Sequence, residues 1–336
     1  MQVRTAKAAI LAQSRQPLVI DEITLPDTLE AGQVLVQVLH TTICGAQINE
    51  IEAAKGPDRF LPHLLGHEAS AIVRETGPGV MHVKPGDTVV LHWRPSQGIQ
   101  SRPPRYSWNG APLNAGWVTT FNQYAVVSEN RMTVVAPEFD AKVAPLLGCA
   151  VTTAAGVINN DAKVKLGESV VVFGVGGVGL NLVQFAALAG AHPIVAVDLV
   201  PAKLDMARAR GATHAVDGGN TADLAAEIRA IVGAKGPDKV IETTGGPHAD
   251  GTCVLVGVPS EKVTISTLPI HFNKVLTGSH GGAAVPHVDI PRLIRLVAAG
   301  KLSFDGIITH EFPLEEINAA LEMVRSGAAG RVLVNL

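Results

Sequence analysis

The sequence predicts an α/β protein in which a mostly-β part is joined to a doubly wound parallel sheet. Three observations lead to this fold class. Residues 1–150 read as short strands separated by turns, apolar strands alternate with helical patterns beyond Glu168, and a glycine-rich turn, Gly174–Gly179, follows the first of these strands. At 336 residues the chain is long enough for two domains, because single hydrophobic cores stop growing near ~250–300 residues.

The N-terminal part is predicted to be rich in strands. Residues Gln33–His40 alternate in part between apolar and polar, as a half-buried strand does. The sequence Lys-Pro-Gly-Asp at Lys84–Asp87 is typical of a turn, and it leads into a strand at Thr88–His92.

From Glu168 onward the pattern alternates between strands and helices. The expected strands are Val170–Phe173, Ile194–Asp198, Val240–Glu242 and Cys253–Val256, and the expected helices are Val178–Ala189, Pro201–Arg210 and Ala222–Val232. Pro201 at a helix start and Gly211 just beyond its end fit the asymmetry of helix termini. The C-terminal segment is expected to add two helices and a last strand, near Pro291–Ala299, Leu314–Ser326 and Arg331–Val334.

Composition excludes several classes of protein. The net charge of −3 gives no positive field for nucleic acid or for an anionic membrane surface. Three cysteines are too few for a disulfide-stapled secreted fold. The stretch Ser169–Val197 contains no Asp, Glu, Lys or Arg, but its glycines favour a strand–turn–helix–strand unit over a membrane span. The N-terminus shows no signal peptide, so we expect a cytoplasmic enzyme.

The context of the glycine-rich turn predicts a dinucleotide site. A buried strand precedes it, a helix follows it, and Asp198 ends the next strand. The glycines let backbone N–H groups approach a pyrophosphate, to which the helix N-terminus adds partial positive charge. Asp198 is placed to accept both hydroxyls of the adenosine ribose, and Leu199 and Val200 offer no cation to a 2′-phosphate. We therefore expect NAD rather than NADP; the alternative is a structural turn without a ligand.

Three residues could share one metal ion, namely Cys44, His67 and Cys149. Their wide spacing alone does not establish a site, because a lone buried cysteine usually serves as a small core residue. The order of these residues, ahead of a dinucleotide turn, suggests metal-assisted hydride transfer.

Several ordered motifs carry a resemblance that covers nearly the whole chain. They are Ile43-Cys44-Gly45, Gly66-His67-Glu68, Val83–Asp87, Leu147–Thr153, the glycine-rich turn, Asp198 with Lys203, and Val256–Val258. On these motifs the sequence resembles the zinc-dependent medium-chain alcohol/polyol dehydrogenases. The resemblance implies a GroES-like catalytic domain over 1–150 and 285–336, and an NAD-binding Rossmann domain over 151–284.

The resemblance also implies site residues. Zinc ligands would be Cys44, His67 and Cys149, with Glu68 as a nearby or exchanging ligand, and Thr153 would lie near the nicotinamide. The implied cofactor-binding residues are Gly174, Gly176, Gly177, Val178, Gly179, Asp198, Lys203, Val256, Gly257, Val258 and Arg331. Two thiolates and one imidazole are the known catalytic set of alcohol dehydrogenase, and they leave a fourth position open. An alcohol oxygen bound there would favour hydride loss to nicotinamide.

The sequence departs from the family beside the first zinc cysteine. Family members usually continue with Gly-Ser/Thr-Asp-x-His, whereas this chain has Ala46, Gln47 and Asn49. Ala46 lacks the hydroxyl that begins a proton relay, Asn49 cannot take up a proton as histidine can, and Gln47 puts a neutral amide where a carboxylate is usual. The proton could instead pass through a zinc-bound water, a substrate hydroxyl or Glu68, or Ala46 could simply enlarge the pocket for a bulkier secondary alcohol.

The four closely spaced cysteines of a structural zinc lobe are missing, since no cysteine lies between Cys44 and Cys149. We therefore expect one catalytic ion per chain and no structural zinc. All tryptophans and tyrosines crowd into residues 93–124, which favours an aromatic mini-core over a wall of the substrate cleft. The same region carries Arg94, Arg102 and Arg105 without a carboxylate; these are either surface arginines or a site for an anionic substrate.

The connection between Val240–Glu242 and Cys253–Val256 is unusually short. Parallel neighbours need a crossover of roughly 10–12 residues or more, normally with a helix, and relatives have a helix at this point. Either this protein has lost the helix or the sequence omits a stretch near 247–251, and we favour an omission.

These observations predict a zinc- and NAD-dependent oxidoreductase that interconverts a secondary alcohol, of a polyol or sugar derivative, and its ketone. The expected partner is a small-molecule alcohol or ketone, with no nucleic acid and no membrane, and the resemblance implies a homodimer or homotetramer. One alternative is an enzyme with retained NAD that catalyses a net non-redox reaction such as epimerisation or cyclisation. Another is a non-catalytic NAD-binding protein on the same fold.

Overall fold

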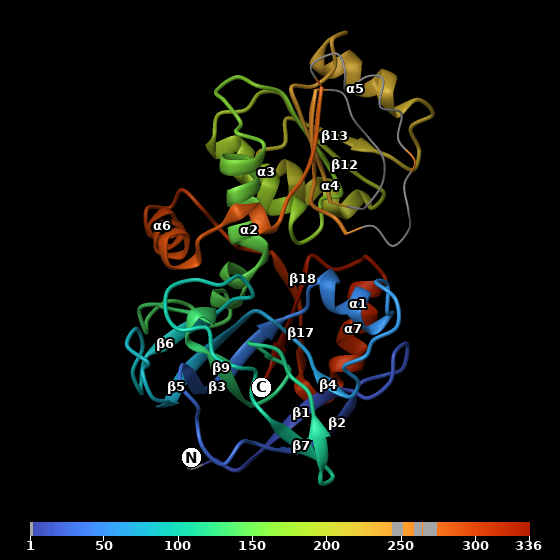
Figure 1. The fold of residues 1–336 in the computed structure, drawn as a ribbon. Helices are drawn as coiled ribbons and strands as arrows, with labels where there is room; N and C mark the ends of the chain where they lie inside the picture. The colour runs from blue at the N-terminus through green and yellow to red at the C-terminus, as the bar shows by residue number, and fades with distance from the viewer. Residues whose placement is uncertain (1–2, 244–250, 259–263, 265–273) are drawn as a thin grey trace. The chain divides into compact units, whose positions relative to one another are not determined.

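The computed structural model describes residues 3–243, 251–258, 264 and 274–336, and the chain divides into two compact units (Figure 1). The first unit comprises Met1–Cys149, Val285–Ala298 and Phe304–Leu336. The second comprises Ala150–Ala284 and Ala299–Ser303. The expected boundary placed all of 285–336 in the first unit, whereas residues 299–303 cluster with the second.

The first unit is built on two sheets, as expected for a mostly-β domain. A five-stranded sheet has the order β4-β1-β2-β7-β8. Its strands are β1 (Thr5–Leu11), β2 (Val19–Thr24), β4 (His63–Leu64), β7 (Tyr106–Trp108) and β8 (Ala111–Leu113). All of its pairings are antiparallel.

The second sheet of this unit has seven strands and positions the candidate site. Its order is β10-β6-β5-β3-β18-β17, with β9 also paired to β3. Its strands are β3 (Gln33–Thr42), β5 (Ala69–Thr76), β6 (Thr88–Leu91), β9 (Tyr124–Ser128), β10 (Met132–Val134), β17 (Ile308–Pro313) and β18 (Arg331–Asn335). Thr42, at the end of β3, pairs with Leu333 of β18, and Thr41 pairs with Ala69 of β5. The residues just beyond these strand ends are therefore neighbours.

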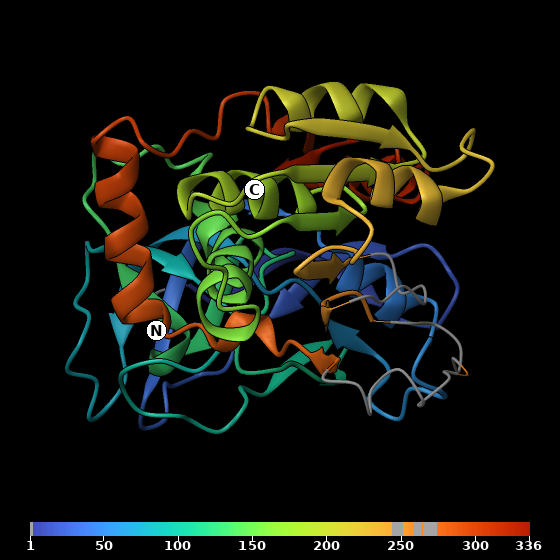
Figure 2. The same cartoon turned by 90° about the horizontal axis from the view of Figure 1, so that it is seen from above.

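Short helices complete the first unit. They are α1 (Gly45–Ile51), α6 (Pro286–Ala298), α7 (Ile317–Arg325) and the 3₁₀ turns η1 (Glu129–Arg131), η2 (Ala144–Gly148) and η6 (Leu314–Glu316). The sequence prediction started α6 near Pro291, and this start is wrong. Pro286 occupies the first helical position, and Asp289 accepts the N–H of Val285 at 2.7 Å, so the helix begins earlier and contains Pro291. This helix is the orange one seen along its side in Figure 2.

The second unit contains the predicted doubly wound sheet. Six strands, all parallel, have the order β13-β12-β11-β14-β15-β16. They are β11 (Val170–Phe173), β12 (Ile194–Asp198), β13 (His214–Asp217), β14 (Lys239–Glu242), β15 (Thr252–Leu255) and β16 (Val275–Gly278). The helical segments are α2 (Ala150–Gly156), η3 (Val157–Asp161), α3 (Gly179–Leu188), α4 (Pro201–Arg208), α5 (Leu224–Val232) and η5 (Gly281–Ala283).

The uncharged stretch Ser169–Val197 lies in this second unit as β11, α3 and most of β12, which confirms the strand–turn–helix–strand prediction. All four side chains of β11 are buried, because both faces of a parallel sheet are covered. In the described part of the chain, none of the helices combines the length and the apolar character that a bilayer crossing requires. The suspected omission near 247–251 falls almost wholly on 244–250, outside the described residues, although β14 and β15 do pair in parallel.

Candidate metal centre

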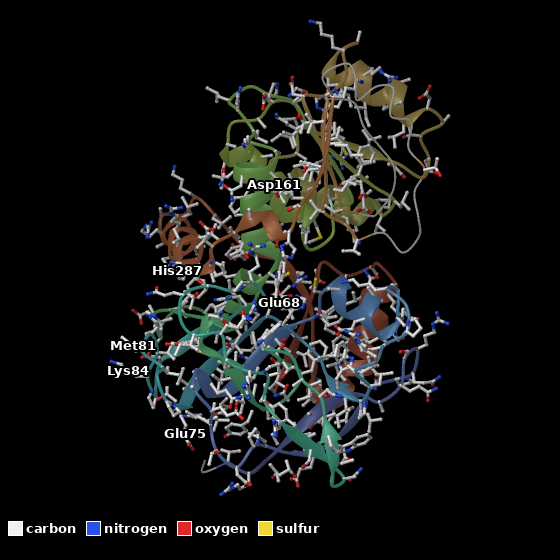
Figure 3. All side chains as sticks on the ribbon, viewed as in Figure 1. Glu68, Glu75, Met81, Lys84, Asp161 and His287 are labelled. Carbon is white, nitrogen blue, oxygen red and sulfur yellow. The ribbon has the colours of Figure 1, made fainter. Side chains whose placement is uncertain are left out.

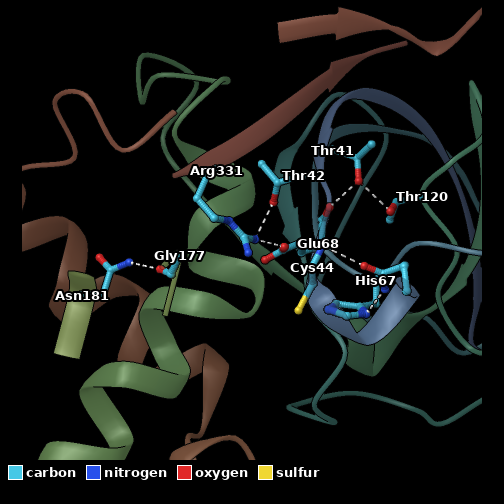
Figure 4. Close-up of polar contacts among 10 residues, drawn as sticks. Thr41, Thr42, Cys44, His67, Glu68, Thr120, Gly177, Asn181 and Arg331 are labelled. Carbon is cyan, nitrogen blue, oxygen red and sulfur yellow. Dashed lines mark hydrogen bonds and ion pairs between the residues drawn. The ribbon is translucent and has the colours of Figure 1, made fainter. Parts of the chain in front are cut away.

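Cys44, His67 and Cys149 converge in the first unit (Figure 4 shows Cys44 and His67). Cys44 follows β3 and caps α1, His67 precedes β5, and Cys149 follows η2. Their ligand atoms, two Sγ and one imidazole nitrogen, all lie within 4.8 Å of one another. The chain thus brings together the three residues that its sequence singled out.

A glycine makes this convergence possible. A Cβ at Gly148 would lie 2.3 Å from the carbonyl oxygen of Leu91 and 2.8 Å from Cβ of Glu68. Any larger residue would push the backbone of Cys149 away from the strand that follows His67. The Leu-Gly-Cys sequence therefore has a packing role in addition to supplying a thiol.

The donor set fits a zinc ion. Nε2 of His67 is buried and makes no hydrogen bond to any described residue, which costs free energy unless a ligand fills the position. A hydrogen bond between the two thiols holds the pKa of Cys44 well below its usual range, while the same contact and burial raise the pKa of Cys149. Thiolate and imidazole donors are those that zinc prefers, and three protein ligands leave a fourth position open.

Gln47 contacts two of the three candidate ligands, Cys44 and His67. Its Oε1 accepts the backbone N–H of Cys44 at 2.9 Å, and its Nε2 lies 2.5 Å from Nδ1 of His67. Gln47 is 1% exposed. It is therefore a buried polar bridge between the backbone of one candidate ligand and the ring of another.

Glu68 is not part of the group of three. Its side chain, labelled in Figure 3, is fully buried, and its Oε1 pairs with Nη2 of Arg331, which also donates to Oγ1 of Thr42 at 2.9 Å (Figure 4). Burial raises the pKa of Glu68 and the guanidinium of Arg331 opposes that rise. Thr41 donates to the carbonyl oxygen of Glu68 at 2.7 Å. The structure thus places Glu68 beside the candidate ligands, engaged with Arg331 rather than aimed at a shared metal position.

The predicted cofactor residues assemble in the second unit. Gly174 has a φ of +81°, and a Cβ at Gly179 would lie 1.9 Å from the Gly174 carbonyl oxygen, so both positions require glycine. Asp198 accepts the N–H of Val175 at 2.8 Å, within the turn itself. Nζ of Lys203 is the nearest group to a Cβ built at Gly176, at 4.0 Å. The turn, Asp198 and Lys203 are therefore neighbours, as the resemblance implied.

The remaining predicted residues fall in different places. Thr153 is a buried residue of α2, in the second unit. The N–H groups of Val256 and Gly257 both donate to the carbonyl oxygen of Glu242, and Val258 is exposed. Arg331 lies in the first unit, where it is 4% exposed and its Nε makes no hydrogen bond to a described residue.

Comparisons with known proteins bear on the identity of the chain. Residues 30–138 match the family model "Alcohol dehydrogenase GroES-like domain", and residues 177–299 match "Zinc-binding dehydrogenase". An S-(hydroxymethyl)glutathione dehydrogenase of Escherichia coli O139:H28 is 31% identical over 98% of this chain and 99% of its own length. The chain belongs to the zinc-dependent medium-chain alcohol dehydrogenases.

Other relatives agree with this membership. Alcohol dehydrogenase 1 of Trifolium repens is 30% identical over 100% of this chain and 98% of its own. The crystal structure of benzyl alcohol dehydrogenase from Acinetobacter calcoaceticus superimposes with a TM-score of 0.88 at 25% identity, covering 99% of this chain and 100% of that one. The predicted fold class, a GroES-like domain with a Rossmann sheet, is confirmed.

As an alcohol dehydrogenase, the chain is unusual along α1. Ala46 is exposed and Asn49 is half-buried on this helix, so the relay hydroxyl and histidine of the family are replaced by a methyl group and an amide. Neither side chain can move a proton. These two positions of α1 therefore offer no group for a proton relay.

Sequence reasoning missed Arg131, the last residue of η1. Its side chain is buried, donating to the carbonyl oxygen of Trp93 and to Oε1 of Gln100, with its Cζ 5.2 Å from the ring centroid of Trp117. Burial and the nearby charge of Arg94 lower its pKa. Among the described residues no carboxylate pairs with it. In the sequence, the feature that could have drawn attention to Arg131 was its position next to an apolar strand.

The crowded aromatics divide into two groups. Tyr106, Trp108 and Tyr124 pack within one apolar cluster of the first unit, as a mini-core would. Trp117 is 40% exposed, and the guanidinium of Arg94 lies 5.6 Å from the ring centroid of Trp93. The mini-core interpretation thus holds for three of the five rings.

His92, which directly follows β6, is a buried histidine of the first unit. It is 1% exposed, its Nδ1 lies 2.8 Å from the carbonyl oxygen of Arg94, and its Nε2 lies 3.0 Å from Oγ1 of Thr133. Because a carbonyl can only accept, Nδ1 carries the proton and the neutral ring is fully bonded. Burial lowers its pKa from 6.5 to about 4.

The pKa of His92 predicts a loss of stability in acid. Between pH 6.5 and about 4, His92 is protonated in the unfolded chain but neutral in the folded chain. The free energy of unfolding therefore decreases as the pH falls through this range. We expect the free energy of unfolding to drop by about 3 kcal/mol through this window because of His92. Urea titrations at several pH values should show a shallower pH dependence for His92→Gln. His214→Gln, at an exposed histidine, provides the comparison for the loss of one histidine. Equal slopes for wild type and His92→Gln would contradict the assignment.

Proposed function

We propose that this dehydrogenase uses zinc and NAD to interconvert a secondary alcohol, in a polyol or sugar derivative, and its ketone. The observation that carries the proposal is the convergence of Cys44, His67 and Cys149 within 4.8 Å, with a buried His67 nitrogen that lacks a partner. A zinc ion held by these residues would supply Lewis-acid polarisation of an alcohol or carbonyl oxygen.

The chain's own residues tune the charge of this centre. Two thiolates and one neutral imidazole together carry −2 charge, and the Glu68–Arg331 pair beside them is neutral overall. Arg331 is 4% exposed, so little solvent screens its charge from the thiolates. The charge of Arg331 therefore lowers the pKa of both thiols, whereas Glu68 raises the pKa of Cys149, so the arginine favours the thiolate chiefly at Cys44.

Because Ala46 and Asn49 of α1 cannot relay a proton, another group must accept the proton of the substrate hydroxyl. Glu68 offers only Oε2 for this role, because its Oε1 is held by Arg331. A polyol, however, brings its own second hydroxyl next to the reacting carbon, and that group can pass the proton toward solvent. The absence of a hydroxyl at Ala46 thus favours a substrate with neighbouring hydroxyls.

NAD rather than NADP is supported by two carboxylates at one edge of the parallel sheet. Asp198 and Asp217 end neighbouring strands and are paired in register. A 2′-phosphate at this edge would meet two negative charges, whereas ribose hydroxyls can donate to Asp198.

A negatively charged group on the substrate is supported by Arg94 and Arg131. Leu91, at the end of β6, contacts Gly148 beside Cys149, and Trp93 and Arg94 follow directly along the chain. Arg94 is half-buried and Arg131 is buried without a carboxylate partner among the described residues, whereas Arg102 and Arg105 are exposed. Of the arginines in this region, Arg94 and Arg131 are therefore the ones we assign to an anionic substrate.

Matched neutral and phosphorylated or carboxylated polyols test the proposal. With zinc-loaded protein we expect NADH to appear with NAD, at least about tenfold faster than NADPH with NADP, and preferentially with the anionic polyols. Arg94→Gln should raise KM for the anionic substrates with little change for neutral ones, and Arg105→Gln, at an exposed position, serves as its control. Turnover of neutral polyols alone would reject the anionic class, and product without NADH release would favour a non-redox reaction with retained NAD.

A further inference from the structure

The side-chain amide of Gln47 has one acceptor atom, Oε1, and this atom accepts a hydrogen bond from the backbone at the start of α1. Oε1 accepts the N–H of Cys44, the N-cap residue, and the N–H of Gln47 reaches back to the Cys44 side chain. This reciprocal arrangement is a capping box, in which a glutamine or glutamate at the third helical position satisfies the N-cap backbone. An N–H group cannot face the amide nitrogen, so this bond fixes which end of the amide is which.

The other end of the amide then decides the state of His67. The Nε2 group of Gln47 can only donate, and it lies 2.5 Å from Nδ1 of His67, so Nδ1 must accept. A neutral imidazole carries one proton, which is consequently on Nε2. Nε2 is the ring nitrogen that is not bonded to Gln47, and it is the one buried without a partner. A protonated nitrogen has no lone pair for a metal.

We propose that Gln47 is a positioning residue that holds His67 in the tautomer unable to bind metal, so that zinc binds only when the amide turns. After the turn, Oε1 accepts the proton now on Nδ1, and the N–H of Cys44 loses its acceptor at the start of α1. Zinc binding and helix capping therefore compete for one oxygen. This inference rests on the proposed zinc site.

A carboxylate at this position would remove the competition. Its two oxygens can accept the N–H of Cys44 and the Nδ1–H of His67 at the same time. Partners that accept from a ligating histidine orient the ring and raise its basicity, and losing one typically lowers metal affinity by about 10–100-fold. The glutamine of this chain thus makes zinc more weakly held and more exchangeable than a carboxylate would.

The tautomer of His67 in the unaltered, metal-free protein tests the first half of the proposal. With ¹⁵N-labelled histidine, NMR should show the proton of His67 on Nε2 before zinc is added and on Nδ1 afterwards. The resonance is assigned by its disappearance in His67→Gln. A proton on Nδ1 in the metal-free protein would overturn the proposal.

The affinity for zinc tests the second half. Gln47→Glu, which keeps the length of the side chain, should bind zinc about 10–100-fold more tightly in competition with a chromogenic chelator. Asn49→Asp adds the same charge on the same helix, away from His67, and should change the affinity less than threefold. An unchanged or weaker affinity for Gln47→Glu, or an equal gain for both variants, would refute the proposal. If Cys149→Ser binds zinc as tightly as the wild type, the zinc site itself is wrong, which is a separate failure.

Discussion

Replacing Cys149 by serine is expected to remove zinc and to lower kcat/KM for alcohol oxidation by about 10³-fold or more. The variant loses one of the two thiolates that neutralise the ion, and the hydroxyl that remains stays protonated at neutral pH. Loss of metal polarisation of the substrate oxygen removes several kcal/mol of transition-state stabilisation, and each 1.4 kcal/mol is about tenfold in rate. Zinc content by mass spectrometry and NADH formation by absorbance measure both effects.

Cys253 provides the matched control. It is also a fully buried cysteine, but it lies in β15 of the second unit, away from the group of three. Burial raises the pKa of its thiol to about 11, so it stays protonated at neutral pH. Cys253→Ser should keep one zinc per chain and near-normal turnover. Full zinc content and turnover in Cys149→Ser would show that the assigned ligand set is wrong.

Replacing Arg331 by methionine is expected to reduce the free energy of unfolding of the metal-free protein by about 3–5 kcal/mol. The Arg331 and Glu68 side chains are 5% and 0% exposed, so removing the arginine leaves a buried carboxylate without its countercharge. Urea unfolding at neutral pH measures the change. The double variant Glu68→Gln/Arg331→Met should recover much of the loss, because no uncompensated charge remains.

A surface arginine shows what burial contributes to this effect. Arg325 pairs with Glu52 and Glu322, but its side chain is 29% exposed and its partners are more exposed still. Arg325→Met should therefore cost less than about 1 kcal/mol. If Arg325→Met and Arg331→Met reduce the free energy of unfolding by similar amounts, the buried carboxylate of Glu68 does not need Arg331 as its countercharge.

Where a local pattern decides the structure, the sequence was sufficient. The glycine-rich turn and Asp198 were predicted because strand, turn and helix are formed by residues close together in the chain, and φ at Gly174 leaves no other choice. The start of α6 was misjudged because Pro291 is conspicuous, whereas the bond from Val285 to Asp289 that begins the helix is not. The candidate metal ligands were recognised through a family resemblance, since their spacing alone permits many readings.

Contacts between distant residues needed the tertiary structure. Glu68 and Arg331 are 263 positions apart, and the pairing of β18 with β3 brings Arg331 to the start of β5, where it pairs with Glu68 beside the candidate ligands. The burial of Arg131 depends in the same way on strand pairing.

Gln47 shows the division most clearly. The sequence and its family resemblance together determined that a neutral amide stands where relatives carry a carboxylate, beside the candidate metal ligands. Only the tertiary structure decided which way the amide points, because the N–H of Cys44 and the ring of His67 come from different segments and contact its opposite ends. The residue type determines how many hydrogen bonds a side chain can make, but the partners that the fold brings within reach determine which of them it makes.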